Sequence, residues 1–263
     1  MLIPVLSPEQ STDWDRRAKQ SGMALGTLMD AAGRAVAQVV ASRFPERLSG
    51  GVLIAVGPGN NGGDGWVAAR ALHRLDIPVF VAAVPGEPSP LNRQMADLAR
   101  GDGVRLVEID GPWPSVTLGI DALLGTGARG SLRPAVAAVV QRLTDLAVPL
   151  IAVDGPTGLD LGSGVVHGLA LGAHLSVTFG GLRRGHLLAR DESGDIVVVD
   201  IGHPAPDPAW PTLMTDHVAA GLVGHFPAGA HKGTRGRIVV VGGATGMSGA
   251  LRMAARSSFA AGA

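Results

Sequence analysis

The stretch "GPGNNGGDGWVAAR", residues 57–70, indicates the fold more clearly than any other part of this sequence. A run of apolar residues, 52–56, precedes it, and residues 67–75 then repeat apolar side chains at helical spacing. A strand, a glycine-rich loop and a helix in this order form one unit of an α/β domain, and backbone N–H groups at the start of such a helix can bind an anion. We therefore expect a ligand-binding loop between this strand and this helix.

The alternation of strand and helix continues along the chain. Short apolar runs, many of them β-branched, alternate with helix-period stretches, and an amphipathic helix over residues 25–39 precedes the first strand. This pattern predicts an α/β fold, a three-layer αβα sandwich with a Rossmann-like, mostly parallel sheet. We expect strands at 52–56, 79–84, 104–109, 118–124, 150–153, 175–179 and 196–201, and helices at 67–75, 91–99 and 135–146.

Composition excludes several classes of protein. The 263 residues are 46% hydrophobic, which is enough for a large core, and the 22 basic and 22 acidic residues cancel. The balance gives no bulk attraction to nucleic acid or to a membrane. The absence of cysteine excludes disulfides and thiolate metal sites, and no apolar run approaches the ~20 residues that cross a bilayer. The first residues do not resemble a secretory signal. We expect a soluble, cytoplasmic protein without nucleic-acid or membrane partners.

The C-terminal part of the chain reads as a separate region. Residues 202–211 contain four prolines in ten positions and are expected to be a linker. A strand at 238–241, a glycine-rich loop and a helix follow. These elements are too few to bury a core of their own, so they either pack on the first domain or begin a second one. We place the domains at 1–208 and 209–263.

Two interpretations of the 57–70 loop compete with an enzymatic site. Gly57, Gly59 and Gly62 match the letters of a dinucleotide-binding motif, but the first acidic residue after the second expected strand, Glu87, comes late and after a proline. The asparagines and the aspartate of the loop could also serve only in turn formation and helix capping. Two further loops, 121–134 and 153–160, favour a site, because both follow parallel strands at the edge where such sheets bind ligands.

The three loops together resemble a known family. "GPGNNGGDGWVAAR", "DALLGTGARGSLR" and "AVDGPTGLD", with "LMDAAGRAVA" before them and "VTFGGLRRGH" and "VVVDIG" after, are similar to the NAD(P)H-hydrate epimerases, or YjeF N-terminal domains. The likeness covers roughly residues 5–204. The tail "AHKGTRGRIVVVGGATGMSGA" resembles the start of the ADP-dependent NAD(P)H-hydrate dehydratase, a ribokinase-like domain fused behind many bacterial epimerases.

This resemblance implies an isomerase that interconverts the R and S forms of hydrated NADH and NADPH, damaged cofactors with a hydroxyl at carbon 6 of the nicotinamide ring. Dehydratase activity is expected only of a full-length bifunctional protein, and a homodimer is expected from family habit. The alternative is a non-catalytic Rossmann-like binding or scaffold module, because the fold also occurs in eukaryotic scaffolds. Such a module could lose its catalytic carboxylate and ion ligands, whereas this sequence keeps them or replaces them conservatively.

The resemblance also assigns residues to roles. Asp154 is the expected acid/base group, since a carboxyl at the dry end of a strand can transfer protons in both directions. A potassium ion is expected at Asn61, Asp121 and Thr157, whose oxygen atoms suit a hard monovalent cation. The expected substrate pocket comprises Asp154 together with Asn60, Asn61, Gly62, Gly63, Asp64, Gly125, Thr126, Gly127, Ala128, Arg129, Gly130 and Ser131.

A few positions depart from the family pattern. Thr157 stands for a serine and keeps the hydroxyl, whereas Gly155 replaces an aliphatic residue and is expected to loosen its loop. Asp30 and Ala31 stand where glutamate and asparagine are typical, and Ser131 replaces a proline. Asp160 is a second candidate for proton transfer, although a turn or capping role is the simpler expectation for it.

Overall fold

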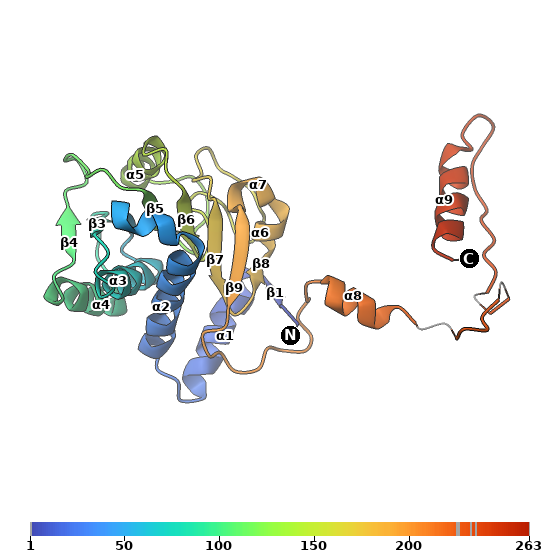
Figure 1. Ribbon diagram of the computed structural model, residues 1–263, viewed down its shortest axis with the longest axis horizontal. Helices are drawn as coiled ribbons and strands as arrows, with labels where there is room; N and C mark the ends of the chain where they lie inside the picture. The colour runs from blue at the N-terminus through green and yellow to red at the C-terminus, as the bar shows by residue number, and fades with distance from the viewer. Residues whose placement is uncertain (1, 225–226, 232, 235, 263) are drawn as a thin grey trace. The chain divides into compact units, whose positions relative to one another are not determined.

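A seven-stranded sheet, parallel throughout, organises the N-terminal part of the chain (Figure 1). The computed structural model describes residues 2–224, 227–231, 233–234 and 236–262. The strand order is β4-β3-β2-β5-β6-β7-β9. Its strands are β2 (Val52–Val56), β3 (Val79–Ala83), β4 (Arg105–Val107), β5 (Leu118–Ala122), β6 (Leu150–Val153), β7 (Leu175–Phe179) and β9 (Asp195–Val199).

The strand order places a topological switch point between β2 and β5. From β2 the chain builds outward through β3 to β4, and it then returns to the other side of β2 to continue from β5 to β9. Open α/β sheets bind ligands at the carboxyl ends of the strands beside such a switch point. The loops that follow β2 and β5 therefore meet where a ligand site is expected.

Helices cover both faces of the sheet, as predicted. In β2, Val52, Ile54 and Val56 belong to the hydrophobic core shared with α2, α3 and α4, while Leu53 and Ala55 belong to the core under α5. Side chains alternate between the two faces of a strand, so a strand buried on both sides is apolar throughout. The three-layer αβα fold is thereby confirmed. The helices of these layers are α2 (Leu25–Arg43), α3 (Asn60–His73), α4 (Pro90–Gly101) and α5 (Pro134–Asp145).

Several elements differ from the expectations. The helix expected at 67–75 begins at Asn60, so the glycine-rich stretch forms the first turns of α3. A helix that the sequence analysis did not predict, α1 (Pro8–Gln20), begins with a capping box between Ser7 and Gln10. The remaining short elements are η1 (Pro45–Gly50), β1 (Val5–Leu6), which pairs with β8 (Leu182–Arg183), α6 (Arg184–Leu188) and α7 (Arg190–Ser193).

The proline-rich stretch 202–211 is not a free linker. Trp14 of α1 stacks on His203 with ring centroids 4.5 Å apart, and its Nε1 donates to the Pro204 carbonyl at 2.9 Å. Backbone hydrogen bonds join Val5 to Pro211 and Leu213 to Ile3. This segment therefore packs on the N-terminal unit, which extends to Leu213.

The residues from Met214 onward form a second unit. It contains α8 (Asp216–Leu222) and α9 (Gly249–Ala260). The strand expected at 238–241 is wrong for this structure, where these residues are extended coil and Val241 is 91% exposed. A strand requires a hydrogen-bonded neighbour, and the described part of this unit provides none. None of the described helices is long and apolar enough to span a membrane.

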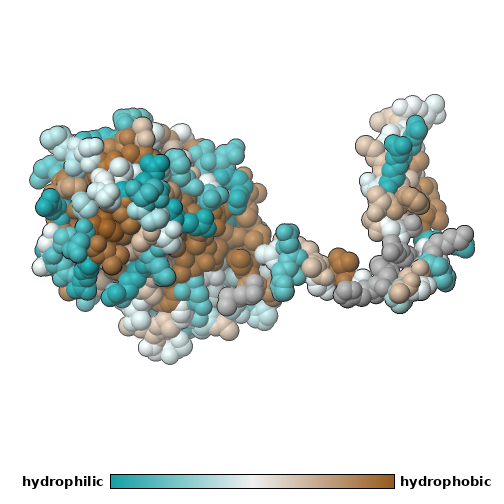
Figure 2. Space-filling view, viewed as in Figure 1, coloured by the Kyte–Doolittle hydropathy of each residue, from teal (hydrophilic) through white to brown (hydrophobic). Residues whose placement is uncertain are grey.

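The sheet ends on one side at β9, whose side chains are only partly covered. Val197 and Val199 of β9 pack against the core but remain half-buried. Figure 2 shows hydrophobic surface over β7 and β9 in the same view as Figure 1.

Candidate active site

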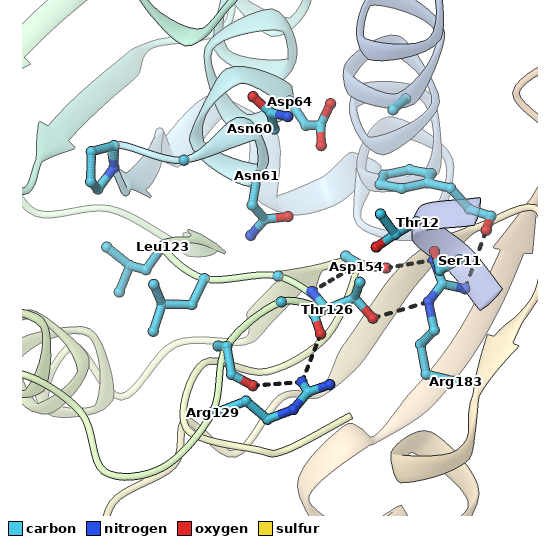
Figure 3. A pocket seen from close by; sticks show the side chains of 18 of the residues that line it. Ser11, Thr12, Asn60, Asn61, Asp64, Leu123, Thr126, Arg129, Asp154 and Arg183 are labelled. Carbon is cyan, nitrogen blue, oxygen red and sulfur yellow. Dashed lines mark hydrogen bonds and ion pairs between the residues drawn. The ribbon is translucent and has the colours of Figure 1, made fainter. Parts of the chain in front are cut away.

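A cavity of about 1000 Å³ opens at the carboxyl edge of the sheet (Figure 3). It lies at the switch point, between the start of α3, the loop after β5 and the end of β6, with α1 forming a further wall. Pockets for small molecules occupy roughly 300–1,000 Å³, so this cavity can hold a ligand of nucleotide size.

The start of α3 forms one wall, and it is fastened from behind. Asn92 of α4 is 3% exposed, and its Nδ2 donates to the carbonyls of Gly57 and Gly59 at 2.8 and 2.6 Å. A Cβ at Gly62 would overlap the Gly57 carbonyl oxygen, so only glycine permits this close turn. Sequence reasoning did not identify Asn92, which holds the strand-to-helix connection in place.

The five predicted residues of α3 divide into two groups. Asn60, Asn61 and Asp64 line the cavity, and the Asn60 Oδ1 accepts from the Ser89 hydroxyl at 2.7 Å. Gly62 and Gly63 are buried behind the wall. Close packing, rather than contact with the cavity, accounts for these two glycines.

The loop after β5 forms the opposite wall, and all seven of its predicted residues line the cavity: Gly125, Thr126, Gly127, Ala128, Arg129, Gly130 and Ser131. Gly130 has a φ of +69°, which glycine adopts readily. Arg129 is largely solvated and turns back on its own loop, donating to the carbonyls of Thr126 and Ala128 at 3.0 and 2.9 Å. The small side chains leave the backbone close to any bound ligand.

Asp154 lies just beyond β6, where its carboxyl group faces the cavity and several donors (Figure 3). The Thr126 N–H donates to Oδ2 at 2.8 Å, and the Thr178 hydroxyl and Arg183 Nη2 donate to Oδ1 at 3.3 Å each. Asp154 has a φ of +65°, which is uncommon for a residue with a side chain. The surrounding contacts hold this carboxyl group in one position.

Arg183 and His186 are functional candidates that the sequence analysis did not assign, although both lie in the quoted stretch "VTFGGLRRGH". Arg183 is 4% exposed, and it also donates to Thr126 Oγ1 at 3.1 Å and the Gly181 carbonyl at 2.8 Å. It thereby joins the loop after β5 to the end of β6.

His186 is fully buried and bonds the backbone of Asp154. Its Nδ1 accepts from the Arg183 N–H at 3.0 Å, so its Nε2 carries the proton and donates to the Asp154 carbonyl at 2.8 Å. Burial lowers the pKa of His186 to about 4, so this ring is neutral at neutral pH. A neutral imidazole in one tautomer fits a positioning role for Asp154.

Asp121 and Thr157 form a second buried pair beneath the cavity. The Thr157 hydroxyl donates to Asp121 Oδ1 and its N–H donates to Oδ2, both at 2.8 Å. Leu123 N–H donates to Oδ1 at 3.1 Å. Asp121 is completely buried, and burial raises its pKa to about 6 against the lowering effect of these hydrogen bonds.

Asn61, the third predicted ion ligand, lies against Gly125 and forms no hydrogen bond with either residue of this pair. A Cβ at Gly125 would be 3.2 Å from both Asn61 Oδ1 and Asp154 Oδ2, so the two side chains face the same glycine. The Asn61 Nδ2 is buried and has no hydrogen-bond partner among the described residues. The structure thus joins Asp121 and Thr157 directly, and Asn61 and Asp154 face the same glycine.

Asp64 differs from Asp154 in having no hydrogen-bond donor for its carboxyl group in the described part of the chain. No hydrogen bond to its carboxyl oxygens is formed by the residues that the structure describes. Burial raises the pKa of Asp64 well above its usual range, and the charges of Asp154 and Asp15 raise it further. This carboxyl group therefore favours its protonated form.

Two secondary expectations concern Asp160 and Gly155. Asp160 Oδ1 accepts from the N–H groups of Gly162 and Ser163 at 2.7 and 3.1 Å, which is the expected turn role. A Cβ at Gly155 would lie 2.6 Å from Leu161 Cδ2 and 3.0 Å from His186 Nε2. The expectation of a loosened loop is wrong, because Leu161 and His186 occupy the space that an aliphatic side chain would take.

The described residues contain no group of three or more His, Cys, Asp or Glu side chains that could hold a metal ion.

Fold and site together define a class of protein: a doubly wound α/β domain with a carboxyl-lined ligand cavity at its switch point. The family model described as "YjeF-related protein N-terminus" matches residues 25–185, and this chain belongs to that family. The resemblance drawn from the sequence is thereby confirmed.

Curated relatives that match this chain carry the name bifunctional NAD(P)H-hydrate repair enzyme Nnr. The protein of Thermanaerovibrio acidaminovorans is 35% identical over 280 residues, covering 100% of this chain and 54% of the relative. The protein of Escherichia coli is 34% identical over 253 residues, covering 92% and 48%. The chain thus spans about half the length of these relatives. The crystal structure of yeast ynu0 (YNL200c) matches with a TM-score of 0.68 and 26% identity, covering 74% of this chain and 87% of the yeast chain.

Proposed function

We propose that this chain epimerises hydrated NADH and NADPH, interconverting their R and S forms. The observation that carries the proposal is the Asp154 carboxyl group, which faces a cavity of about 1000 Å³ formed by the family's glycine-rich loops. Inversion at carbon 6 requires proton transfer to and from the hydroxyl oxygen or the ring nitrogen, and a carboxyl group beside the bound ring can take part in it as acid or base. The names of the curated relatives support the same substrate.

The binding residues follow from the walls of the cavity. Gly125 to Ser131 would present backbone N–H groups to the phosphates, since a glycine-rich backbone can approach an anion closely. Asn60, Asn61 and Asp64 would contact the substrate from α3. Gly62 and Gly63 would shape this wall from behind.

The test uses purified R-hydrate and S-hydrate in separate reactions. We expect each isomer to approach the equilibrium mixture faster with the protein than without it, as followed by chromatography. Asp154→Asn should reduce the enzymatic rate by at least about 100-fold, the usual contribution of one acid/base group. If the wild-type chain gives no acceleration over buffer, the proposal is wrong.

We also propose a potassium site at Asp121, Thr157 and Asn61. The donors fit such an ion, because Asp121 is completely buried and no cationic side chain among the described residues compensates it. All three residues offer hard oxygen atoms. When bound, the ion would neutralise Asp121 and fasten the loops of the cavity, while Asp154 retains the proton-transfer role.

Residues 209–263 are proposed to be the linker and first part of a ribokinase-like dehydratase domain, since the curated relatives are bifunctional and about twice as long. Incubating this chain with S-hydrate and ADP should yield no NADH, which its absorbance would reveal. A homodimer and a cytoplasmic location are likewise proposals from the family, and sedimentation of the purified chain tests the first.

A further inference from the structure

Asp64 is a partly buried carboxyl group that lines the cavity and has no part in the proton transfer proposed for Asp154. It comes from α3, whereas Asp154 comes from the end of β6, and Figure 3 shows the two residues on different sides of the cavity. Both residues line the same cavity of about 1000 Å³. One bound ligand can therefore contact both.

The surroundings of the two carboxyl groups are opposite in kind. Asp154 receives hydrogen bonds from Thr126, Thr178 and Arg183, the last a cationic donor, and these suit the carboxylate form. Asp64 receives none from the described residues. Environments that separate two carboxyl groups in this way are typical of an acid and a base that act as a pair.

The chemistry of epimerisation creates a need for such a pair. If the hydroxyl leaves one face of the ring as water, a proton must be delivered on that face. If water then adds to the opposite face, a proton must be removed there. A single carboxyl group held in one position by fixed donors reaches one face of a bound ring.

Resting on the proposed epimerase function, we propose that Asp64 and Asp154 are two proton carriers on opposite faces of the nicotinamide ring. In one direction, the Asp64 carboxyl proton passes to the hydroxyl oxygen as the C6–O bond breaks. The bonding electrons leave with water, and the nitrogen lone pair forms a C=N bond. Water then adds from the other face, the C=N electrons return to nitrogen, and Asp154 accepts the proton. The reverse reaction exchanges the two roles, and proton exchange with solvent restores protonated Asp64 and ionised Asp154 before the next forward turnover.

Oxygen exchange in ¹⁸O-labelled water shows which carboxyl group acts on which face of the nicotinamide ring. The wild-type chain should epimerise and place label in both isomers. In Asp64→Asn, epimerisation should fall at least about 100-fold, while Asp154 still exchanges the hydroxyl of the isomer that faces it. Asp154→Asn should show the converse, with label entering only the other isomer. The uncatalysed rates in buffer are subtracted throughout.

The matched control is Asp97→Asn, which changes an exposed carboxylate of α4 and should retain the wild-type rate and labelling. Asp64→Asn should remain folded, with a melting temperature at pH 7 no lower than that of the wild type. The reason is that a neutral amide replaces a group whose charged form the fold disfavours.

Three results would contradict the proposal that Asp64 and Asp154 act as a pair of proton carriers. They are an Asp64→Asn rate within about threefold of the wild type, entry of label into the same isomer in both variants, or wild-type epimerisation without label. These outcomes all require an active wild-type enzyme. A wild-type chain without epimerase activity would instead refute the proposed function itself.

Discussion

The Arg183 guanidinium lies 3.3 Å from Asp154 Oδ1, and both side chains are almost inaccessible, at 5% and 11% exposure. Arg183 also bonds Thr126 on the neighbouring loop and the Gly181 carbonyl. Removing one member of a buried ion pair leaves the other charge uncompensated, which costs far more than breaking a pair at the surface. The ion pair therefore stabilises the domain and also fixes the position of the Asp154 carboxyl group.

Arg183→Gln should destabilise the chain by about 3–5 kcal/mol, because the Asp154 carboxylate loses its cationic partner. Arg183→Lys keeps the charge but not the planar fork, so we expect an intermediate loss. Urea unfolding of each variant measures these differences. The control, Arg34→Gln, breaks an exposed pair with Asp30 and should cost at most about 1 kcal/mol. Equal losses for Arg183→Gln and Arg34→Gln would contradict this account of the buried pair.

His186 predicts how the stability of the domain depends on pH. Its pKa is about 4 in the folded chain and about 6.5 when unfolded, so the unfolded state binds more protons between these values. The stabilisation that the neutral His186 ring contributes is therefore complete above pH 6.5, and it is lost as the pH falls towards 4.

His186→Gln cannot take up this proton, so its urea midpoint should fall less over that range than the wild-type midpoint. The His186→Gln variant should also be less stable than the wild type at pH 7, because a flexible amide replaces the fixed donor to the Asp154 carbonyl. His217 of α8 offers the matched control, since it lies in the other unit and should leave the pH dependence unchanged when replaced by glutamine. Parallel wild-type and His186→Gln curves would count against His186 as the source.

Close packing between α2 and α3 depends on Gly33. A Cβ there would collide with the Val67 side chain and approach the Asp64 carbonyl oxygen at 2.5 Å. Gly33→Ala should therefore lower the melting temperature, although alanine favours a helix by about 1 kcal/mol over glycine. Gly101→Ala in α4 has open space and gains only the propensity, so it should be neutral or stabilising. A stable Gly33→Ala variant would mean that the two helices can separate at little cost.

The sheet was predictable from the sequence because its strands are buried on both faces. Residues 52–56, 150–153 and 175–179 have the bounds that the sequence predicts. By contrast, α1 is largely polar. Its buried residues recur at helical spacing but include a single large apolar side chain, Trp14, so its capping box at Ser7 and Gln10 was the clearer clue.

The site was predictable only as far as its loops. The roles of Asn92, Arg183 and His186 depend on partners 29 to 35 residues away in the chain, at Gly57 and Asp154. No local pattern encodes such contacts. The strand expected at 238–241 failed for the complementary reason, since no strand in the described part of the chain lies beside its apolar residues to pair with them.

The buried Asp121 carboxyl group predicts a stability effect of potassium that requires no substrate. An ion that binds the folded state alone stabilises it by RT ln(1 + [L]/Kd), about 2.7 kcal/mol at a hundredfold excess over Kd. Raising potassium chloride at constant ionic strength, with tetramethylammonium chloride as the balance, should therefore raise the melting temperature in a saturable manner.

Asp121→Asn should abolish this potassium response, because the amide removes the negative charge. It should also lower the melting temperature in the absence of potassium, since an amide NH₂ cannot accept from both Thr157 N–H and Leu123 N–H as the two carboxyl oxygens do. Asp145→Asn, an exposed change at the end of α5, controls for general salt effects and should keep the wild-type response. A response of equal size in Asp121→Asn would place the ion elsewhere, whereas no response in the wild-type chain would remove potassium from the proposal and leave proton transfer at Asp154 untouched.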